Sequence, residues 1–182
     1  MRLEQLAQRA KDDREAFGRL YDLARPRIYG YVARRIPNVS DAEDVTSQIF
    51  EKALSGIRGF DPGRAPFLAW LYRIAHNATV DYYRKEGGRC LVSFDDAMVV
   101  YECGSSLSEE YIRKYLKVLG LLTQLPASYQ EVLGLRLIEH MGNDEIAVLL
   151  GYSSRYVAVK ISRALRSLRK LAVRQGILDE LV

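Results

Sequence analysis

FDPGRAPFLAWLYRIAHNATVDYYRK, residues 60–85, joins a loop signal to a helix signal. Two prolines and a glycine within residues 61–66 interrupt any helix, so this part must be a loop. From Phe67 onward, apolar side chains recur at spacings of three and four, which places them on one face of a helix. The residues of that face are Phe67, Leu71, Ile74, Ala78 and Tyr82. The stretch therefore predicts a loop followed by an amphipathic helix with one side in a core.

The other two sides of this helix carry cations, an amide and flat rings. One stripe consists of Arg73, Asn77 and Arg84, and a second of Tyr72, His76, Thr79 and Tyr83. Side chains of these kinds hold a nucleic acid strand with its bases exposed. An ordinary amphipathic helix with a polar side in water explains the same periodicity, so the pattern alone leaves both interpretations open.

The stretch resembles the second conserved region of an extracytoplasmic-function (ECF) sigma factor, one of the short group of bacterial RNA polymerase initiation factors. The family pattern is close to F-D-P-G-R followed by F-x-A-W-L-Y-R-I-A-x-N, and residues 60–64 and 67–77 match both parts in register. The resemblance implies a set of contacts to the minus-ten promoter element, made by Phe60, Arg64, Tyr72, Arg73, His76, Asn77, Arg84 and Lys85.

The resemblance further implies a pocket for one base flipped out of the non-template strand. The Phe60 ring would stack on or wall that base, and the amide of Asn77 would read its edge, because an amide both donates and accepts hydrogen bonds. Neighbouring aromatics such as Tyr72 would help to hold the strands apart. The alternative for Asn77 is a hydrogen bond to the backbone of the loop.

Composition limits the class of protein. The 182 residues are 48% hydrophobic and 27% charged, which is typical of a globular protein. The sequence has no apolar run of membrane-spanning length and no signal-peptide core, so we expect a cytoplasmic protein without a membrane span. Two Cys and two His lie in no metal-ligand spacing, and no nucleophile–base set or P-loop is present. We therefore expect no metal, no cofactor and no enzymatic activity.

Charge is distributed in three blocks. Residues 1–85 carry a net charge of +4, residues 86–112 a net charge of −5, and residues 113–182 a net charge of +5. Basic blocks favour phosphate partners, whereas the acidic middle block, which shows no sustained period, is typical of a flexible connector.

The first 57 residues predict a helical unit. We expect a short helix over residues 3–10, a second helix that starts near Asp13 and is kinked or broken at Pro26, and a third that ends near Ile57. Ser40 and Glu43 have the spacing of a capping box for the third helix.

An acidic surface lies on the outward side of this third helix. Residues 41–50 resemble the family motif D-A-E-D-[LV]-x-Q-E-x-F, with Ser47–Gln48 in place of its Gln-Glu pair. The resemblance implies docking on the clamp helices of the polymerase's largest subunit through Asp41, Glu43, Asp44 and Gln48. The alternative is that these acids only suit the positive end of the helix dipole.

The last third of the chain predicts a helix-turn-helix. Ser128 is the expected cap of a helix that ends near His140, and helices are expected over residues 144–150 and from Ser153 or Ser154 to about Gln175. Residues 144–153 resemble the family's E-I-A-x-x-L-G-x-S, in its fourth conserved region. The expected apolar face of the last helix consists of Val157, Ile161, Ala164, Leu165, Leu168 and Ala172.

Seven cations and no acid occupy the other side of the last helix. A solvated face normally mixes charge signs, so this pattern favours phosphate contact. Ala158 and Val159 stand where the family usually has polar residues, which leaves apolar contact to a thymine methyl as their means of readout. The residues implied to contact the minus-thirty-five element are Arg136, Ser154, Arg155, Ala158, Val159, Lys160, Ser162 and Arg163.

These observations predict an all-α chain with two helical domains, residues 1–87 and 111–182, joined by a flexible acidic linker, residues 88–110. The resemblance implies a dissociable sigma factor whose partners are promoter DNA and core RNA polymerase, through the clamp helices of its largest subunit and the flap of its second-largest subunit. An anti-sigma factor is a common further partner in the family. The alternative is a free-standing helix-turn-helix regulator, which leaves the polar stripes of residues 60–85 unexplained.

Overall fold

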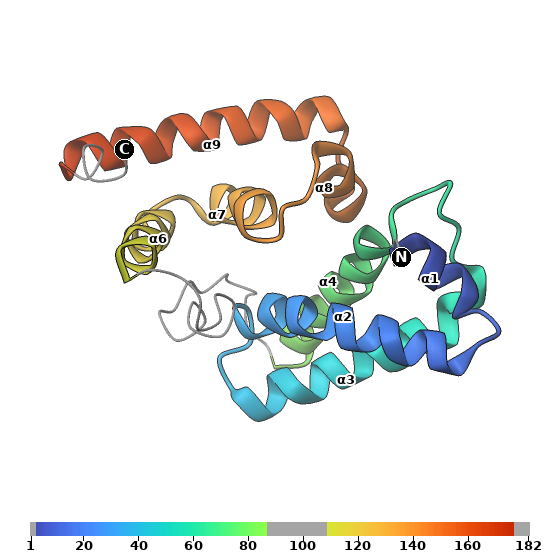
Figure 1. The fold of residues 1–182 in the computed structure, drawn as a ribbon. Helices are drawn as coiled ribbons and strands as arrows, with labels where there is room; N and C mark the ends of the chain where they lie inside the picture. The colour runs from blue at the N-terminus through green and yellow to red at the C-terminus, as the bar shows by residue number, and fades with distance from the viewer. Residues whose placement is uncertain (1–2, 87–108, 177–182) are drawn as a thin grey trace. The chain divides into compact units, whose positions relative to one another are not determined.

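The chain divides into two compact units, residues 1–90 and 91–182, which are described separately. The structure, a computed structural model, describes residues 3–86 and 109–176 (Figure 1). All regular elements in those residues are helical, which confirms the all-α prediction. The predicted linker lies outside the described residues apart from its last two, which begin a helix. Each described helix is too short or too polar to cross a membrane.

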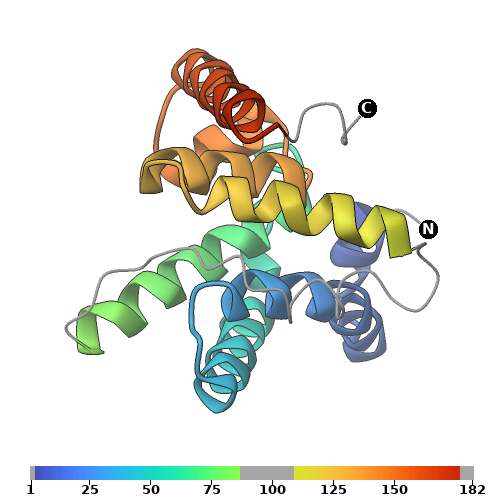
Figure 2. The ribbon, with the colours of Figure 1, turned by 90° about the vertical axis from the view of Figure 1, so that its left-hand side faces the viewer.

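Over residues 3–86, unit 1 is a bundle of four helices in which α3 packs on both α2 and α4, and α1 packs on α2. Figures 1 and 2 show α3 and α4 lying at an angle to each other. Apolar side chains from all four of these helices fill the core, among them Leu6, Leu20, Ile49 and Leu71. The helices are α1 (Leu3–Arg9), α2 (Arg14–Ala33), α3 (Val39–Gly56) and α4 (Phe67–Glu86), with a 3₁₀ turn η1 (Ile57–Gly59) after α3.

The start of α2 agrees with the sequence, but its continuity does not. The Asp13 carboxylate accepts hydrogen bonds from the backbone N–H groups of Glu15 and Ala16, and the bond from Ala16 is the largest cause of the lowered pKa of Asp13. Of the predicted kink or break at Pro26, the break is wrong, because α2 runs through this position without interruption, and the kink stays a prediction. Pro26 lies on the solvent side, while Ala24 and Ile28 on either side of it are buried. Packing of these neighbours compensates for the hydrogen bond that proline removes.

Helix α3 is capped by Asn38 and not by Ser40. The Asn38 side-chain oxygen accepts a 3.1 Å hydrogen bond from the backbone N–H of Asp41. Ser40 already lies in the first turn of the helix, so the predicted capping box is wrong. Asparagine is as good a cap as serine, and the sequence offers both within three positions.

Between residues 109 and 176, unit 2 shows four helical segments, and α9 packs on α6, α7 and α8. Leu122, Leu133, Ile146 and Val157 are buried in its core. The segments are α6 (Glu109–Leu122), α7 (Ala127–Leu133) continued by the π-helical turn η3 (Gly134–Ile138), α8 (Asn143–Leu150) and α9 (Ser154–Arg174). The predicted cap at Ser128 is wrong, because Pro126 occupies the cap position of α7 and no side chain caps it.

The turn between α8 and α9 follows the sequence prediction. Gly151 ends α8 in the left-handed region, with φ of 71°, where a residue without a Cβ is favoured. Two residues later the Ser153 hydroxyl oxygen accepts a 3.2 Å hydrogen bond from the backbone N–H of Tyr156 and starts α9. At the other end of α8, Glu145 accepts a 2.6 Å hydrogen bond from the backbone N–H of Gly142. These caps fix a helix-turn-helix.

Candidate nucleic-acid interface

Three rings anchor the loop that precedes α4. The ring centroid of Phe60 lies 5.7 Å from that of Phe67 and 5.4 Å from that of Trp70. Within the loop, Asp61 accepts a 2.9 Å hydrogen bond from the backbone N–H of Gly63 and lies 3.5 Å from the guanidinium of Arg64. The loop is therefore shaped by its own residues and held against the first turn of α4.

The stacking role expected of Phe60 does not agree with its burial. Its side chain is only 2% exposed, so the ring has no free face for a base in this structure. Phe60 acts instead as the anchor that positions the loop. Arg64, whose side chain is 87% exposed, is the loop's cation at the surface.

One stripe of α4 is open to solvent, as the sequence predicts. Arg73 and Asn77, one helical turn apart, are both exposed, and Arg84 and Lys85 extend the stripe at the end of the helix. Arg84 is bound to Asp81 at 3.0 Å in an exposed ion pair, which stabilises the fold only slightly. Within the described part of unit 1, the Asn77 amide makes no hydrogen bond to the loop or to any other residue.

The second predicted stripe faces the protein. Tyr72 is 1% exposed and meets the edge of the Tyr31 ring at 5.4 Å, and the Tyr31 hydroxyl shares a 3.2 Å hydrogen bond with Nδ1 of His76. Thr79 is fully buried, and the Tyr83 hydroxyl donates to the backbone carbonyl of Arg35. Tyr72 is thus not exposed and His76 is half-buried, while their contact to the minus-ten element stays a prediction. The reason is that α4 is covered on two sides, by α2 and by α3.

Sequence reasoning missed the buried cation behind this second stripe. The guanidinium carbon of Arg35 lies 3.6 Å from the ring centroid of Tyr31, and the same side chain donates a 3.0 Å hydrogen bond to the Tyr31 carbonyl. Arg35 is 4% exposed, so this cation–π contact lies away from water, where such contacts are strongest. The only signal in the sequence is the four-residue spacing from Tyr31 to Arg35.

The acidic surface of α3 is real, but one of its predicted members belongs to the fold. Glu43, Asp44 and Gln48 are exposed. Asp41 is half-buried and accepts a 2.7 Å hydrogen bond from the Tyr82 hydroxyl, which ties α3 to α4. The exposed surface is therefore made by Glu43, Asp44 and Gln48.

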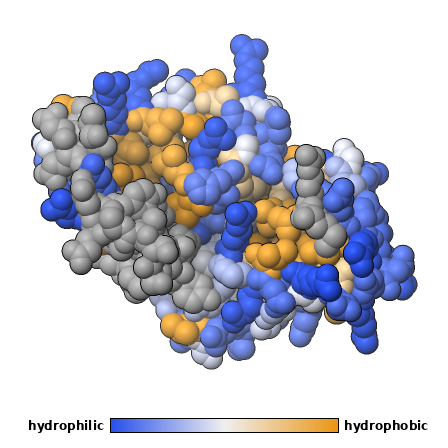
Figure 3. All heavy atoms as spheres, in the orientation of Figure 1, coloured by the Kyte–Doolittle hydropathy of each residue, from blue (hydrophilic) through white to orange (hydrophobic). Residues whose placement is uncertain are grey.

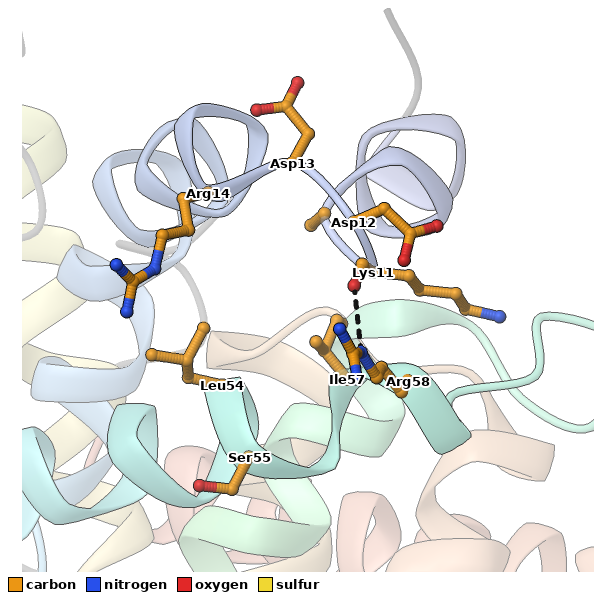
Figure 4. A pocket seen from close by; sticks show the side chains of 9 residues that line it. Lys11, Asp12, Asp13, Arg14, Leu54, Ser55, Ile57 and Arg58 are labelled. Atoms are coloured by element: carbon orange, nitrogen blue, oxygen red, sulfur yellow. Dashed lines mark hydrogen bonds between the residues drawn. The ribbon is translucent and has the colours of Figure 1, made fainter.

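A hollow of about 440 Å³ opens beside the turn between α1 and α2 (Figure 4). Arg58 donates a 3.4 Å hydrogen bond across it to the backbone carbonyl of Lys11, which is the dashed line in Figure 4. Two acids, Asp12 and Asp13, and two more cations, Lys11 and Arg14, also line the hollow. Neither charge sign dominates, and we assign it no ligand.

The cations of α9 lie at the surface, as the sequence predicts. All of them are exposed except Lys160, which is half-buried, and Ser162 is also exposed. Ser154 and Ala158 are half-buried, whereas Val159 is 45% exposed.

The predicted core position of Leu165 is wrong, because its side chain is 42% exposed. Helical periodicity places it at the edge of the apolar face. The exposed cations are Arg155, Arg163, Arg166, Arg169, Lys170 and Arg174.

Arg136 has a structural contact that its predicted role did not include. Its guanidinium donates a 3.0 Å hydrogen bond to the backbone carbonyl of Met141 and so closes the turn before α8. The side chain is still exposed. Arg136 therefore serves the fold whether or not it also meets phosphate.

Sequence reasoning also missed a cluster of two tyrosines and a lysine at the helix-turn-helix. The ring centroids of Tyr152 and Tyr156 lie 4.8 Å apart, and the Lys160 ammonium lies 5.3 Å and 5.6 Å from them. The sequence did contain a signal for this cluster, because Tyr152, Tyr156 and Lys160 follow one another at four-residue spacing, which places helical side chains next to each other.

An exposed strip of cations and an amide on one unit, and a helix-turn-helix with a cationic helix on the other, define a two-part nucleic-acid-binding protein. Figure 3 shows one face of the molecule, on which hydrophilic surface is interrupted by apolar patches. Two family models match the chain: Sigma-70 region 2 over residues 20–89, and Sigma-70, region 4 over residues 115–168.

Known proteins agree with these matches. The chain is 28% identical over 188 residues to the ECF RNA polymerase sigma factor SigW of Bacillus subtilis (strain 168), covering 92% of this chain and 94% of SigW. A solved structure of CnrH in complex with the cytosolic domain of CnrY has a TM-score of 0.61 and 28% identity, covering 93% of this chain and 96% of CnrH. For the fold alone, RpoE of Bartonella quintana, solved with the anti-sigma factor NepR, has a TM-score of 0.63 at 20% identity, covering 85% and 95% of the two chains. This chain belongs to the sigma-70 family and is an ECF sigma factor rather than a stand-alone regulator.

Proposed function

We propose that the chain is a dissociable promoter-specificity subunit that binds core RNA polymerase in the cytoplasm and directs transcription initiation. Its role is binding and positioning, without catalysis of its own. Unit 1 would open the promoter and read its minus-ten element, and unit 2 would read the minus-thirty-five element as duplex. The boundaries of these roles are those expected from the sequence, residues 1–87 and 111–182.

The observation that carries this proposal is the open stripe of α4. Asn77 presents an exposed amide without a hydrogen-bond partner among the described residues, one turn from the exposed cation Arg73. An amide reads the edge of a single unpaired base, and a nearby cation holds its phosphate. A regulator that binds only duplex DNA through the helix-turn-helix has no use for this stripe.

Within this proposal, only some of the residues expected from the sequence to contact the minus-ten element are accessible to it. Arg64, Arg73, Asn77, Arg84 and Lys85 are accessible and keep their proposed contacts to the strand. Phe60 and Tyr72 are buried and act by positioning the loop and α4, and His76 is half-buried between α4 and α2.

Core polymerase is the proposed partner of α3. The exposed acids Glu43 and Asp44, with Gln48, would dock on the clamp helices of the largest subunit, and unit 2 would meet the flap of the second-largest subunit. Charge complementarity gives such docking its specificity and rate. The complexes of CnrH with the cytosolic domain of CnrY, and of RpoE with NepR, make an anti-sigma factor a further candidate partner.

Upstream DNA is the proposed partner of α9. The cations Arg155, Lys160 and Arg163 would contact phosphate, with Ser154, Ala158, Val159 and Ser162 on the same part of the helix and Arg136 from the segment before α8. Phosphate contacts position a protein on DNA but carry no sequence information.

Run-off transcription with reconstituted core polymerase tests the proposal. Templates whose promoter region is randomised are transcribed with and without the protein, and the transcribed templates are sequenced. We expect transcripts only when the protein is present, from templates that share two separated sequence elements. Equal transcription without the protein would contradict the proposed function.

A further inference from the structure

The surface beside the recognition helix carries two half-exposed aromatic rings. Tyr152, in the turn, is 46% exposed, and Tyr156, in the first turn of α9, is 49% exposed. Their ring planes meet at 50°, with centroids 4.8 Å apart. Two large rings packed on each other in water do not serve the core, so their exposure requires another explanation.

Lys160 restrains the rings. Its ammonium lies within cation–π range of both ring centroids, at 5.3 Å and 5.6 Å, and the residue is half-buried although it is a lysine. The backbone beneath the cluster is fixed as well, because the N–H of Tyr156 donates to the cap Ser153. Tyr156 is therefore held in a preferred orientation before any ligand arrives, which lowers the entropic cost of binding.

Val159 extends this surface along α9. It lies three residues after Tyr156 and is 45% exposed, so the two side chains are neighbours on the helix surface. Exposed cations flank them, Arg155 four residues before Val159 and Arg163 four residues after it. The result is a small apolar surface between positive charges at the start of the second helix of a helix-turn-helix.

Such a surface matches the floor of the DNA major groove. The second helix of this motif enters the major groove with its N-terminal residues against the base edges. The one apolar group that the bases present there is the C5-methyl group of thymine. Phosphates on both sides of the groove complement the flanking arginines, whereas an apolar protein partner would leave those cations without counter-charges.

We propose that Tyr156 and Val159 form an apolar reading surface that selects thymine methyl groups in the upstream promoter element, with Tyr152 and Lys160 as the residues that position the Tyr156 ring. The inference rests on the proposed function of unit 2 and adds to it the chemistry of readout. Readout at Val159 and its neighbour Ala158 then comes from methyl contact, because neither has a polar side chain.

Uracil in place of thymine tests this directly, because uracil lacks only the methyl group and keeps the same hydrogen-bonding edges. Holoenzyme assembled from core polymerase and the full chain first selects promoters from duplexes randomised in the upstream segment. The selected promoter is then synthesised with uracil at one upstream thymine at a time, and holoenzyme affinity is measured for each duplex. We expect about a fourfold loss at one or two positions, the affinity equivalent of one buried methyl group.

Variants of the chain identify the reading side chains. With Tyr156→Ala or Val159→Ala, the thymine and uracil duplexes should bind equally well at the position that the missing side chain reads. Tyr156→Phe keeps the ring and should keep the fourfold difference. Leu165→Ala is the matched control, because Leu165 is an exposed apolar residue on the same helix. It lies nine residues, or about two and a half turns, after Tyr156 and therefore on the opposite side of the helix. It should also keep the difference.

Three results would overturn the inference. They are a wild-type holoenzyme that does not distinguish uracil from thymine, a difference that persists in both alanine variants, and a selected upstream element without thymine. Failure of the proposed function would look different, because the holoenzyme would then select no promoter at all. Thermal unfolding of each variant, followed by circular dichroism, verifies that the exposed substitutions leave the fold intact.

Discussion

Asn77 is an exposed polar side chain on α4 that makes no side-chain hydrogen bond to another described residue. If it reads a flipped base, Asn77→Ala removes hydrogen bonds that form only after the strands separate. We expect open-complex formation on duplex promoter to slow roughly tenfold, for a hydrogen bond worth about 1–2 kcal/mol. The measurement is the rate of permanganate reactivity at melted thymines.

A template that is already melted across the start site provides the control for Asn77. The variant should initiate there at nearly the wild-type rate, because no strand separation is needed. Equal loss on both templates would mean that Asn77 supports the fold and would remove it from the proposed site.

The hydrogen bond from Tyr82 to Asp41 links α3 to α4 and should contribute measurably to stability. Tyr82→Phe leaves the half-buried carboxylate without this donor, and we expect unit 1 to lose about 1 kcal/mol of unfolding free energy in urea denaturation. Tyr21→Phe is the matched control, since the Tyr21 ring packs edge-on against Phe50 while its hydroxyl has no hydrogen-bond partner among the described residues. A similar loss in both variants would show that the hydroxyl of Tyr82 adds nothing specific.

Sequence reasoning at the residue scale identified which kinds of side chain matter but not which of them are accessible. The period of α4 placed Phe67 and Leu71 inside and Arg73 and Asn77 outside, as observed. It could not place Tyr72, because a helix covered on two sides has the same period as one covered on a single side. Only the packing partner, Tyr31 on α2, decides this.

Helix α3 presents its acids away from the bundle, so charge reversal there should affect docking and not folding. For Asp44→Lys we expect affinity for core polymerase to fall about tenfold or more, because a cation then replaces an exposed acid of the proposed docking surface. Asp22→Lys on α2 is the matched control, since Asp22 is also an exposed acid of unit 1. Unchanged core affinity for Asp44→Lys in a binding titration would contradict docking through this surface.

Helix α9 is expected to act on DNA mainly as a row of positive charges. Arg163→Ala should weaken holoenzyme binding to all promoter sequences to a similar extent and reduce the slope of log affinity against log salt by about 1. Arg27→Ala removes an exposed cation from α2 and should leave the slope unaltered. A loss confined to one promoter sequence would instead make Arg163 a base-reading residue.

The sequence predicted the presence of each helix better than the residue at which the helix begins. The helices of both units, the turn at Gly151 and the cap at Ser153 follow from period and capping residues. The wrong caps, Ser40 and Ser128, are serines one or two residues inside a helix whose true cap position is held by Asn38 or Pro126. Asn38 and Ser40 have similar capping strength and cannot be ranked without the backbone path, whereas α7 begins after Pro126 with no side-chain cap at all.

At the scale of the whole molecule, each unit has its own core, and the division near residue 90 makes the two units separable. Residues 1–90 should therefore fold alone, because α1 to α4 bury their apolar faces on one another. We expect this fragment to compete with the full chain for core polymerase through α3. It should not support transcription that depends on the upstream element, since it lacks α9.

Competition is measured by displacement of labelled full chain from core, and folding by a cooperative urea transition. The same fragment with Asp44→Lys should fail to compete while it unfolds at the same urea concentration. If the fragment folds but does not displace the full chain from core, the result would contradict docking through α3 and would indicate that the main docking surface lies on unit 2.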